Sequence, residues 1–179
     1  MEKQAMEAQA KLLLKQYGYS FECDAYVDII RFVRRLGFTV GNAALSKNEI
    51  GFLAIHPESD GLLAWERIIG VNSMCSLEQK RFVIAHEFAR SVLYYRQGQI
   101  YLHRKYRNAK DKEDEAADYF ADALLMPREP FLRMFSRFAE KEWQQNAVCM
   151  ELSAIFKVPL SRVSCRLHDV VKIGAGGAE

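Results

Sequence analysis

The stretch from Arg81 to Tyr95, RFVIAHEFARSVLYY, constrains the fold most, because its apolar residues would lie on almost every side of a helix. Such a helix has to lie inside the protein, with other elements packed around it. Ser76 and Gln79 precede it at the spacing of a capping box, so the helix is expected to begin just after Ser76. The same stretch contains His86 and Glu87, and an unpaired buried charge costs several kcal/mol. The sequence therefore predicts a polar site at the centre of the fold.

His86 and Glu87 open the pattern H-E-x-x-H, in which two histidines one helical turn apart bind zinc and the glutamate acts as general base. In this chain the pattern reads HEFAR, and Arg90 occupies the second histidine position. Arginine stays protonated and has no lone pair to donate, so Arg90 cannot ligate a metal. The sequence leaves open whether the helix belongs to a metal enzyme or to a protein that keeps only part of such a site.

The remaining apolar patterns predict an α+β fold. Short runs of β-branched and aromatic residues indicate a small, twisted, mainly antiparallel sheet, with strands at 38–40, 50–55, 62–65 with 68–71, and a possible strand at 99–103. Helical periodicity predicts further helices at 2–16, 25–36, 112–126, 129–139, 143–156 and 161–170. We expect the sheet to pack on the buried helix and on a partner helix, followed by a C-terminal helical unit of the helix-turn-helix kind.

This order of elements suggests three segments. Residues 1–127 are expected to form the α+β core with its N-terminal helices, and 128–170 a helical unit packed on that core. Residues 171–179 contain the glycine-rich end GAGGAE, which predicts a disordered tail.

Composition bounds the location and the partners. The chain has 179 residues and a formal net charge of +2, which does not by itself indicate a nucleic-acid or membrane partner. The four cysteines are widely spaced and no apolar run approaches the length of a membrane span, so we expect reduced thiols, no membrane and a cytoplasmic location.

Asp114 and Asp118 stand one helical turn apart beside the apolar stripe of the predicted helix 112–126. Two such aspartates can simply form the solvated edge of a helix. Zinc peptidases, however, need a third ligand from outside the motif helix and a carboxylate that orients each ligand histidine. Asp114 would then face the metal, and Asp118 would accept the spare N–H of a ligand histidine.

The two helices together resemble the ImmA/IrrE family of zinc metallopeptidases. RFVIAHEFAR is followed, 24 positions after Arg90, by DEAADYFADALLMP, and the family pattern is E-x-x-A-(N or D)-x-F-A-x-x-L-L-M-P. The match comprises Ala117, Asp118, Phe120, Ala121, Leu124, Leu125, Met126 and Pro127. The resemblance covers most of residues 25–170 and implies an α+β peptidase fold.

The resemblance also implies roles for individual residues. His86 would be the first zinc ligand and Glu87 the general base, while Asp114 stands where the family usually has a ligand glutamate, one methylene longer. Arg90 is the main departure, and we hypothesise that its guanidinium replaces zinc as the cation that neutralises Glu87 and Asp114, leaving a metal-free or weakly metallated site. Zinc-dependent proteolysis would otherwise need a recruited ligand such as His103, whose alternative reading is a surface histidine.

Two basic segments have alternative readings. The run His103 to Arg107 is either solvated loop surface or a site for phosphate or an acidic partner. The C-terminal string ELSAIFKVPLSRVSCRLHDV resembles a helix-turn-helix unit, in which Arg162, Arg166 and His168 are the basic residues available to DNA. We favour structural or partner docking over direct contact with nucleic acid.

Members of the family commonly cleave a helix-turn-helix transcriptional repressor, in response to DNA damage or in the control of mobile elements. The resemblance therefore implies a protein substrate, bound as an extended strand along the sheet edge beside the motif helix. A non-catalytic pseudopeptidase that binds a repressor or a toxin partner is the alternative, and DNA binding through the C-terminal helices is a third possibility.

Overall fold

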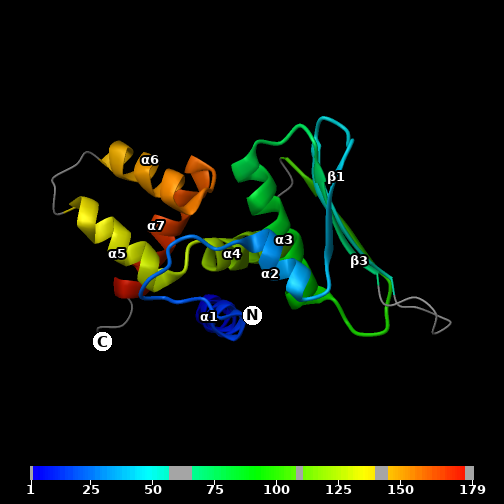
Figure 1. The fold of residues 1–179 in the computed structure, drawn as a ribbon, viewed down its shortest axis with the longest axis horizontal. Helices are drawn as coiled ribbons and strands as arrows, with labels where there is room; N and C mark the ends of the chain where they lie inside the picture. Colours follow the sequence, from blue (N-terminus) through cyan, green and yellow to red (C-terminus); the bar gives the residue numbers. More distant parts are fainter. Residues whose placement is uncertain (1, 57–65, 108–110, 140–144, 176–179) are drawn as a thin grey trace. The chain divides into compact units, whose positions relative to one another are not determined.

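The computed structural model describes residues 2–56, 66–107, 111–139 and 145–175. It shows the α+β fold expected from the sequence (Figure 1). The elements in chain order are α1 (Lys3–Tyr17), α2 (Ile29–Arg35), β1 (Thr39–Ala43), β2 (Glu49–His56), β3 (Glu66–Asn72), α3 (Leu77–Tyr94), β4 (Tyr101–Tyr106), α4 (Lys112–Leu125), α5 (Arg128–Ala139), α6 (Gln145–Phe156) and α7 (Leu160–Ala175). The predicted strand segment 62–65 lies outside the described residues, as does the predicted start of a helix at 143.

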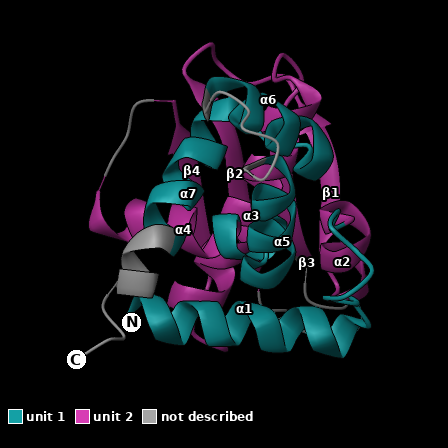
Figure 2. Ribbon diagram, turned by 90° about the vertical axis from the view of Figure 1, so that its left-hand side faces the viewer, with its two compact units in different colours: residues 1–27, 122–179 teal, residues 28–121 magenta. Residues whose placement is uncertain are grey.

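The chain forms two compact units (Figure 2). The sheet unit comprises residues 28–121, and the helical unit comprises residues 1–27 with 122–179. In this division α1 groups with the C-terminal helices, and the sheet unit ends inside α4. Helix α7 also extends to Ala175, five residues beyond the predicted end of the last helix at residue 170.

The four strands of the sheet unit are ordered β1-β3-β2-β4. β2 pairs antiparallel with both β3 and β4, and β1 pairs parallel with β3, so the sheet is mainly antiparallel, as predicted. In this register Leu53 of β2 lies opposite His103 of β4. β4 is an edge strand, and its pairing with β2 fixes which of its side chains face α3.

α3 packs on β2 and β3 and forms the core of the sheet unit. Ser76 and Gln79 complete the predicted capping box, and every residue from Arg81 to Arg90 is buried. The helix approaches the sheet so closely at Gly51 that a Cβ there would lie 2.3 Å from Val83 Cγ1. On the other side, the Phe88 ring makes edge-to-face contacts with Phe32 and Phe38. The motif helix is therefore held on two sides.

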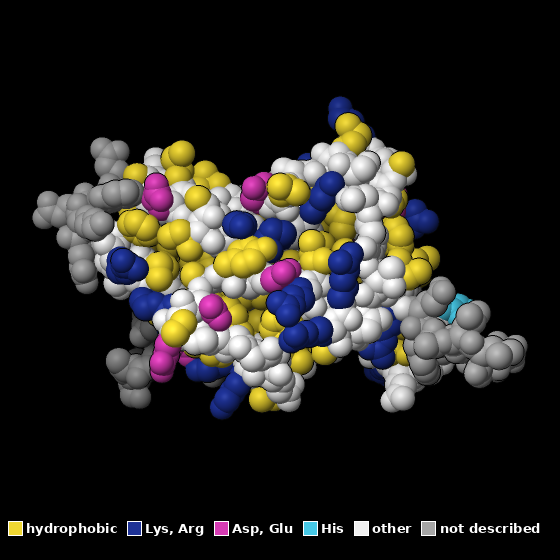
Figure 3. Space-filling view, in the orientation of Figure 1, with side chains coloured by type: hydrophobic (Ala, Val, Ile, Leu, Met, Phe, Trp, Pro, Cys, Tyr) yellow, Lys and Arg dark blue, Asp and Glu magenta, His cyan; other side chains and the backbone are white. Residues whose placement is uncertain are grey.

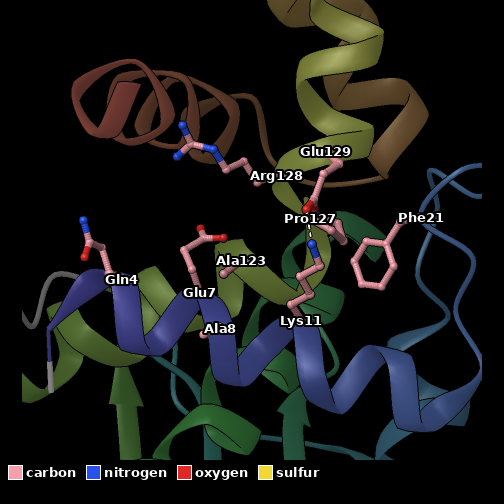
Figure 4. A pocket seen from close by; sticks show the side chains of 9 residues that line it. All are labelled: Gln4, Glu7, Ala8, Lys11, Phe21, Ala123, Pro127, Arg128 and Glu129. Carbon is pink, nitrogen blue, oxygen red and sulfur yellow. Dashed lines mark hydrogen bonds and ion pairs between the residues drawn. The ribbon is translucent and has the colours of Figure 1, made fainter. Parts of the chain in front are cut away.

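In the helical unit, ionic contacts tie α1 to the later helices. A cavity of about 350 Å³ lies between α1 and the start of α5, and Lys11 pairs with Glu129 across it (Figure 4). Glu7 also lines this cavity and pairs with Arg166 of α7. The charged groups of this unit thus largely satisfy one another.

Candidate metal centre

The four site residues predicted from the sequence, His86, Glu87, Asp114 and Asp118, lie close together in the sheet unit. His86 projects from α3, is fully buried, and has its Nδ1 2.7 Å from Asp118 Oδ1 on α4. The imidazole N–H therefore donates to the Asp118 carboxylate, and Nε2 is left facing the opposite way. This contact is the one expected for a carboxylate that orients a ligand histidine, a role that itself stays a prediction.

Asp114 lies one turn earlier on α4 and is 4% exposed. Its Oδ1 is 3.2 Å from His86 Nε2 and 3.4 Å from His103 Nε2. Burial alone would raise the pKa of the Asp114 carboxyl, but the two imidazoles and Lys105 around it hold that pKa well below its ordinary value. Asp114 is therefore a carboxylate, the form that binds metals.

The interpretation of His103 as a surface histidine is wrong, because only 12% of its side chain is exposed. Its Nδ1 lies 2.8 Å from Glu87 Oε2, so this ring bridges Glu87 and Asp114. Burial lowers the pKa of His103, but the bonds to Asp114 and Glu87 outweigh burial and raise the pKa to about 9. Glu87 is itself fully buried, and its other oxygen, Oε1, has no hydrogen-bond partner.

Arg90 does not take the position that we expected. Its Nη2 lies 2.8 Å from Glu113 Oε2, its Nε donates to Tyr101 Oη at 3.2 Å, and Cζ of the guanidinium lies over the Tyr94 ring, 4.8 Å from the ring centroid. Nη1 is 3.7 Å from Asp114 Oδ1, and the expected neutralisation of Glu87 is wrong, because the partner of Glu87 is His103. The physical reason is that Glu113 and Tyr101 bind two of the three guanidinium nitrogens.

Lys105 is a site residue that the sequence reading missed. It is 5% exposed, and its Nζ lies 3.1 Å from Asp118 Oδ1 and 3.9 Å from Asp114 Oδ2. The reading of residues 103–107 as a solvated loop is wrong for His103 and Lys105, which alternate with exposed neighbours along β4. Strand alternation, extended from residue 101 to 106, is the signal that would have placed Tyr101, His103 and Lys105 on one face.

The charges of the cluster do not cancel when both histidines are neutral. Four carboxylates, at Glu87, Glu113, Asp114 and Asp118, stand against the cations Arg90 and Lys105, which leaves a net charge of −2. A divalent cation would balance this charge, and protonation of His103, whose pKa is raised, would balance half of it.

The donor atoms fit a zinc ion. Buried His86 Nε2 and Asp114 Oδ1 both lack a hydrogen-bond partner, and the ligating atoms of His86, His103 and Asp114 all lie within 4.8 Å of one another. Ligands at zinc–nitrogen and zinc–oxygen bond lengths in a tetrahedron are about 3.3 Å apart. The observed separations of 3.2 and 3.4 Å from Asp114 Oδ1 agree with that spacing. The other two histidines, His56 and His168, are exposed and lie outside this group.

Comparisons with known proteins agree with this picture. Residues 33–168 match the IrrE N-terminal-like domain, a peptidase family. A solved structure described as a Mycobacterium tuberculosis transcriptional regulator matches with a TM-score of 0.54 at 15% identity, over 91% of this chain and 46% of that chain. At that identity the likeness concerns the fold, and the chain spans about half of that protein. No curated protein matches the sequence. Among the described residues, no helix combines the length and the apolar character that a membrane crossing requires.

Proposed function

The chain belongs to the IrrE N-terminal-like peptidase family, and on that premise we propose that it acts on a protein partner through a zinc-peptidase site whose proteolysis is impaired. His86 and Asp114 hold the zinc in this proposal, Asp118 orients His86, and Glu87 is the residue that would accept a proton from the attacking water. A zinc ion bound there supplies a Lewis acid for a peptide carbonyl.

The observation that carries the impairment is the position of Arg90. Its permanently charged guanidinium lies 3.7 Å from the Asp114 oxygen that faces His86, where it opposes the charge of a metal. Glu87 is affected as well, because its Oε2 accepts the N–H of His103. That bond engages one oxygen of the general-base candidate with a side chain instead of with water.

The partner in this proposal is a protein segment of a helix-turn-helix repressor, as family resemblance implies. β4 offers a place for it, since β4 pairs with β2 along one edge and no described strand pairs along its other edge. A segment added there as an extended strand would lie beside β4, the strand that carries His103. The fold neighbour is described as a transcriptional regulator, which supports a regulatory context, and a cytoplasmic location is part of the proposal.

Proteolysis by the wild-type chain and by Arg90→His tests the impairment. A histidine at position 90 would stand one helical turn from His86 and remove the opposing cation. We expect cleavage of a purified helix-turn-helix repressor to rise tenfold or more, roughly the lower range of what one catalytic group contributes, and to be abolished by EDTA. Arg96→His adds a histidine at an exposed position past α3 and serves as the control. Equal rates for wild type and Arg90→His would contradict the impairment.

The second candidate is a non-catalytic binding module. The closed character of the site favours it, because His86 and Glu87 are both fully buried. Stoichiometric binding of the repressor with no cleavage, by the wild type and by Arg90→His alike, would identify this function.

Two of the three side chains that the sequence suggested for DNA binding are engaged in contacts within the protein. Arg162 pairs with Asp122, and Arg166 is fully buried against Glu7 and the Met126 carbonyl. On the face drawn in Figure 3, Lys and Arg side chains also lie interspersed with hydrophobic and acidic ones. A gel shift at several salt concentrations checks this, and strong binding that weakens steeply with salt would restore the DNA alternative.

A further inference from the structure

We propose that His103 on β4 replaces the histidine missing from α3, so that His86, His103 and Asp114 together bind zinc, and that Glu87 is the positioning residue of His103. This inference rests on the proposed zinc binding and names the third ligand. In this inference Glu87, the general base in the family pattern, holds the zinc ligand His103. The effect of Glu87 on zinc binding can therefore be measured apart from its effect on proteolysis.

The first argument is the direction of the two imidazoles. Both Nε2 atoms approach the same oxygen, Asp114 Oδ1, at 3.2 and 3.4 Å. Those two separations match the spacing of ligands around one tetrahedral ion, about 3.3 Å, and the ligating atoms of the three residues all lie within 4.8 Å of one another. The ring centroids of His86 and His103 are 5.7 Å apart and the rings are tilted by 36°.

The second argument is that each histidine has a carboxylate behind it. His86 Nδ1 donates to Asp118 Oδ1 at 2.7 Å, and His103 Nδ1 donates to Glu87 Oε2 at 2.8 Å. With Nδ1 directed at a carboxylate, Nε2 is the ring nitrogen left to bind a metal, which displaces any proton that Nε2 carries, and the carboxylate makes the imidazole a better donor. Glu87 therefore stands to His103 as Asp118 stands to His86.

The third argument is the rigidity of the strand that carries His103. β4 is paired with β2, where Leu53 lies opposite His103 and is fully buried. On the α3 side of β4, His103 stands between Tyr101, which binds Arg90, and Lys105, which binds Asp118. A ligand on a paired strand is positioned as firmly as one on a helix.

Arg90 is compatible with this site because its guanidinium is held elsewhere. Glu113, Tyr101 and the Tyr94 ring engage it. Its charge remains close to Asp114 and is expected to weaken zinc affinity without removing a ligand.

The test uses all four histidines of the full chain, each changed to asparagine. Zinc affinity, measured by competition with a chromophoric chelator, is expected to fall about 100-fold in His86→Asn and in His103→Asn. His56→Asn and His168→Asn are matched controls at exposed positions, and their affinity should stay within about twofold of wild type. Wild-type affinity in a folded His103→Asn variant would overturn the inference.

Glu87→Gln separates the two roles of Glu87. If Glu87 only moves protons, Glu87→Gln should lower zinc affinity no more than Glu113→Gln, which removes an equal charge at a residue that pairs with Arg90, whereas a positioning residue should lower it by about tenfold or more. An unchanged zinc affinity in Glu87→Gln would refute the positioning role, whatever the variant does to cleavage.

A measurement that leaves the site intact guards against misfolded variants. In the His56→Asn, His168→Asn double variant the remaining histidines are His86 and His103, and their ring nitrogens can be followed by ¹⁵N NMR. Zinc should shift Nε2 of both rings. A shift of one ring overturns the inference and leaves the proposed function standing. A shift of neither ring, with no zinc retained, contradicts the zinc binding in both proposals.

Discussion

Helix α4 carries two nearly fully buried aspartates in contrasting surroundings. Asp122, in the helical unit, is 1% exposed, and both of its oxygens accept from the forked guanidinium of Arg162, with Nε at 3.0 Å from Oδ1. Asp114, in the sheet unit, is 4% exposed and keeps an oxygen with no hydrogen-bond partner. The same residue type on the same helix is thus closed by an arginine in one unit and faces two imidazole nitrogens in the other.

The two aspartates differ in whether a cation completes their hydrogen bonds. A guanidinium satisfies a carboxylate in both geometry and charge, so the Asp122–Arg162 pair has nothing further to bind. Asp114 has cations nearby, but they are directed largely to other acids: Arg90 to Glu113 and Lys105 to Asp118. Burial without a completed hydrogen bond, rather than burial alone, is what makes Asp114 the candidate ligand.

Removing Asp122 is expected to have the largest effect on stability. Asp122→Ala leaves the Arg162 guanidinium, 17% exposed, without its anion, and breaking a buried pair in this way costs about 3 kcal/mol. Urea unfolding should show this loss, while zinc affinity stays unchanged. Glu151→Ala, at an exposed position on α6, is the control. A loss of zinc binding in folded Asp122→Ala would erase the contrast between the two aspartates.

Asp114→Asn should produce the converse result. Zinc affinity is expected to fall about 100-fold, equivalent to about 2.7 kcal/mol, because the amide cannot replace an anionic ligand. The measure is the zinc-induced rise in the unfolding midpoint, which should be lost in Asp114→Asn and kept in Asp122→Ala. Asp114→Asn with a wild-type response to zinc would show that Asp114 is as structural as Asp122.

Local patterns predicted the helices of the site, because they depend on residues near in sequence. The apolar surround of α3, its capping box and the four-residue step from Asp114 to Asp118 all lie within single helices. The buried motif helix and the meeting of His86 with Asp118 follow from these patterns together with the family pattern.

The features that sequence analysis did not predict depend on contacts between segments distant in sequence. His103 and Lys105 face α3 only because β4 pairs with β2, and a run of basic residues reads locally as a loop. Asp122 and Arg162 are 40 positions apart, so no local spacing reveals their pair. For the same reason the sequence suggested that Arg166 is available to DNA, although Arg166 is fully buried in the helical unit.

Asp118→Asn is expected to lower zinc affinity less than Asp114→Asn does. Asparagine can still accept the His86 N–H, but it no longer carries the charge that strengthens the imidazole as a donor. Zinc affinity should fall about tenfold, less than in Asp114→Asn. The d–d absorption of a cobalt-substituted sample should keep its shape, since no ligand is lost. A changed spectrum would mean that Asp118 is itself a ligand.

The smallest effect is expected from Arg162→Lys, which keeps the charge opposite Asp122 but removes the fork. A lysine donates to one oxygen at a time, so Asp122 would lose one of its two bonds, at a cost of about 1 kcal/mol. Arg137→Lys, at an exposed position on α5, provides the control for the substitution itself. The loss should be the same with and without zinc, because the pair is complete without a ligand. A loss that depends on zinc would mean that the two aspartates of α4 are coupled, and that the closed pair in the helical unit also responds to what the sheet unit binds.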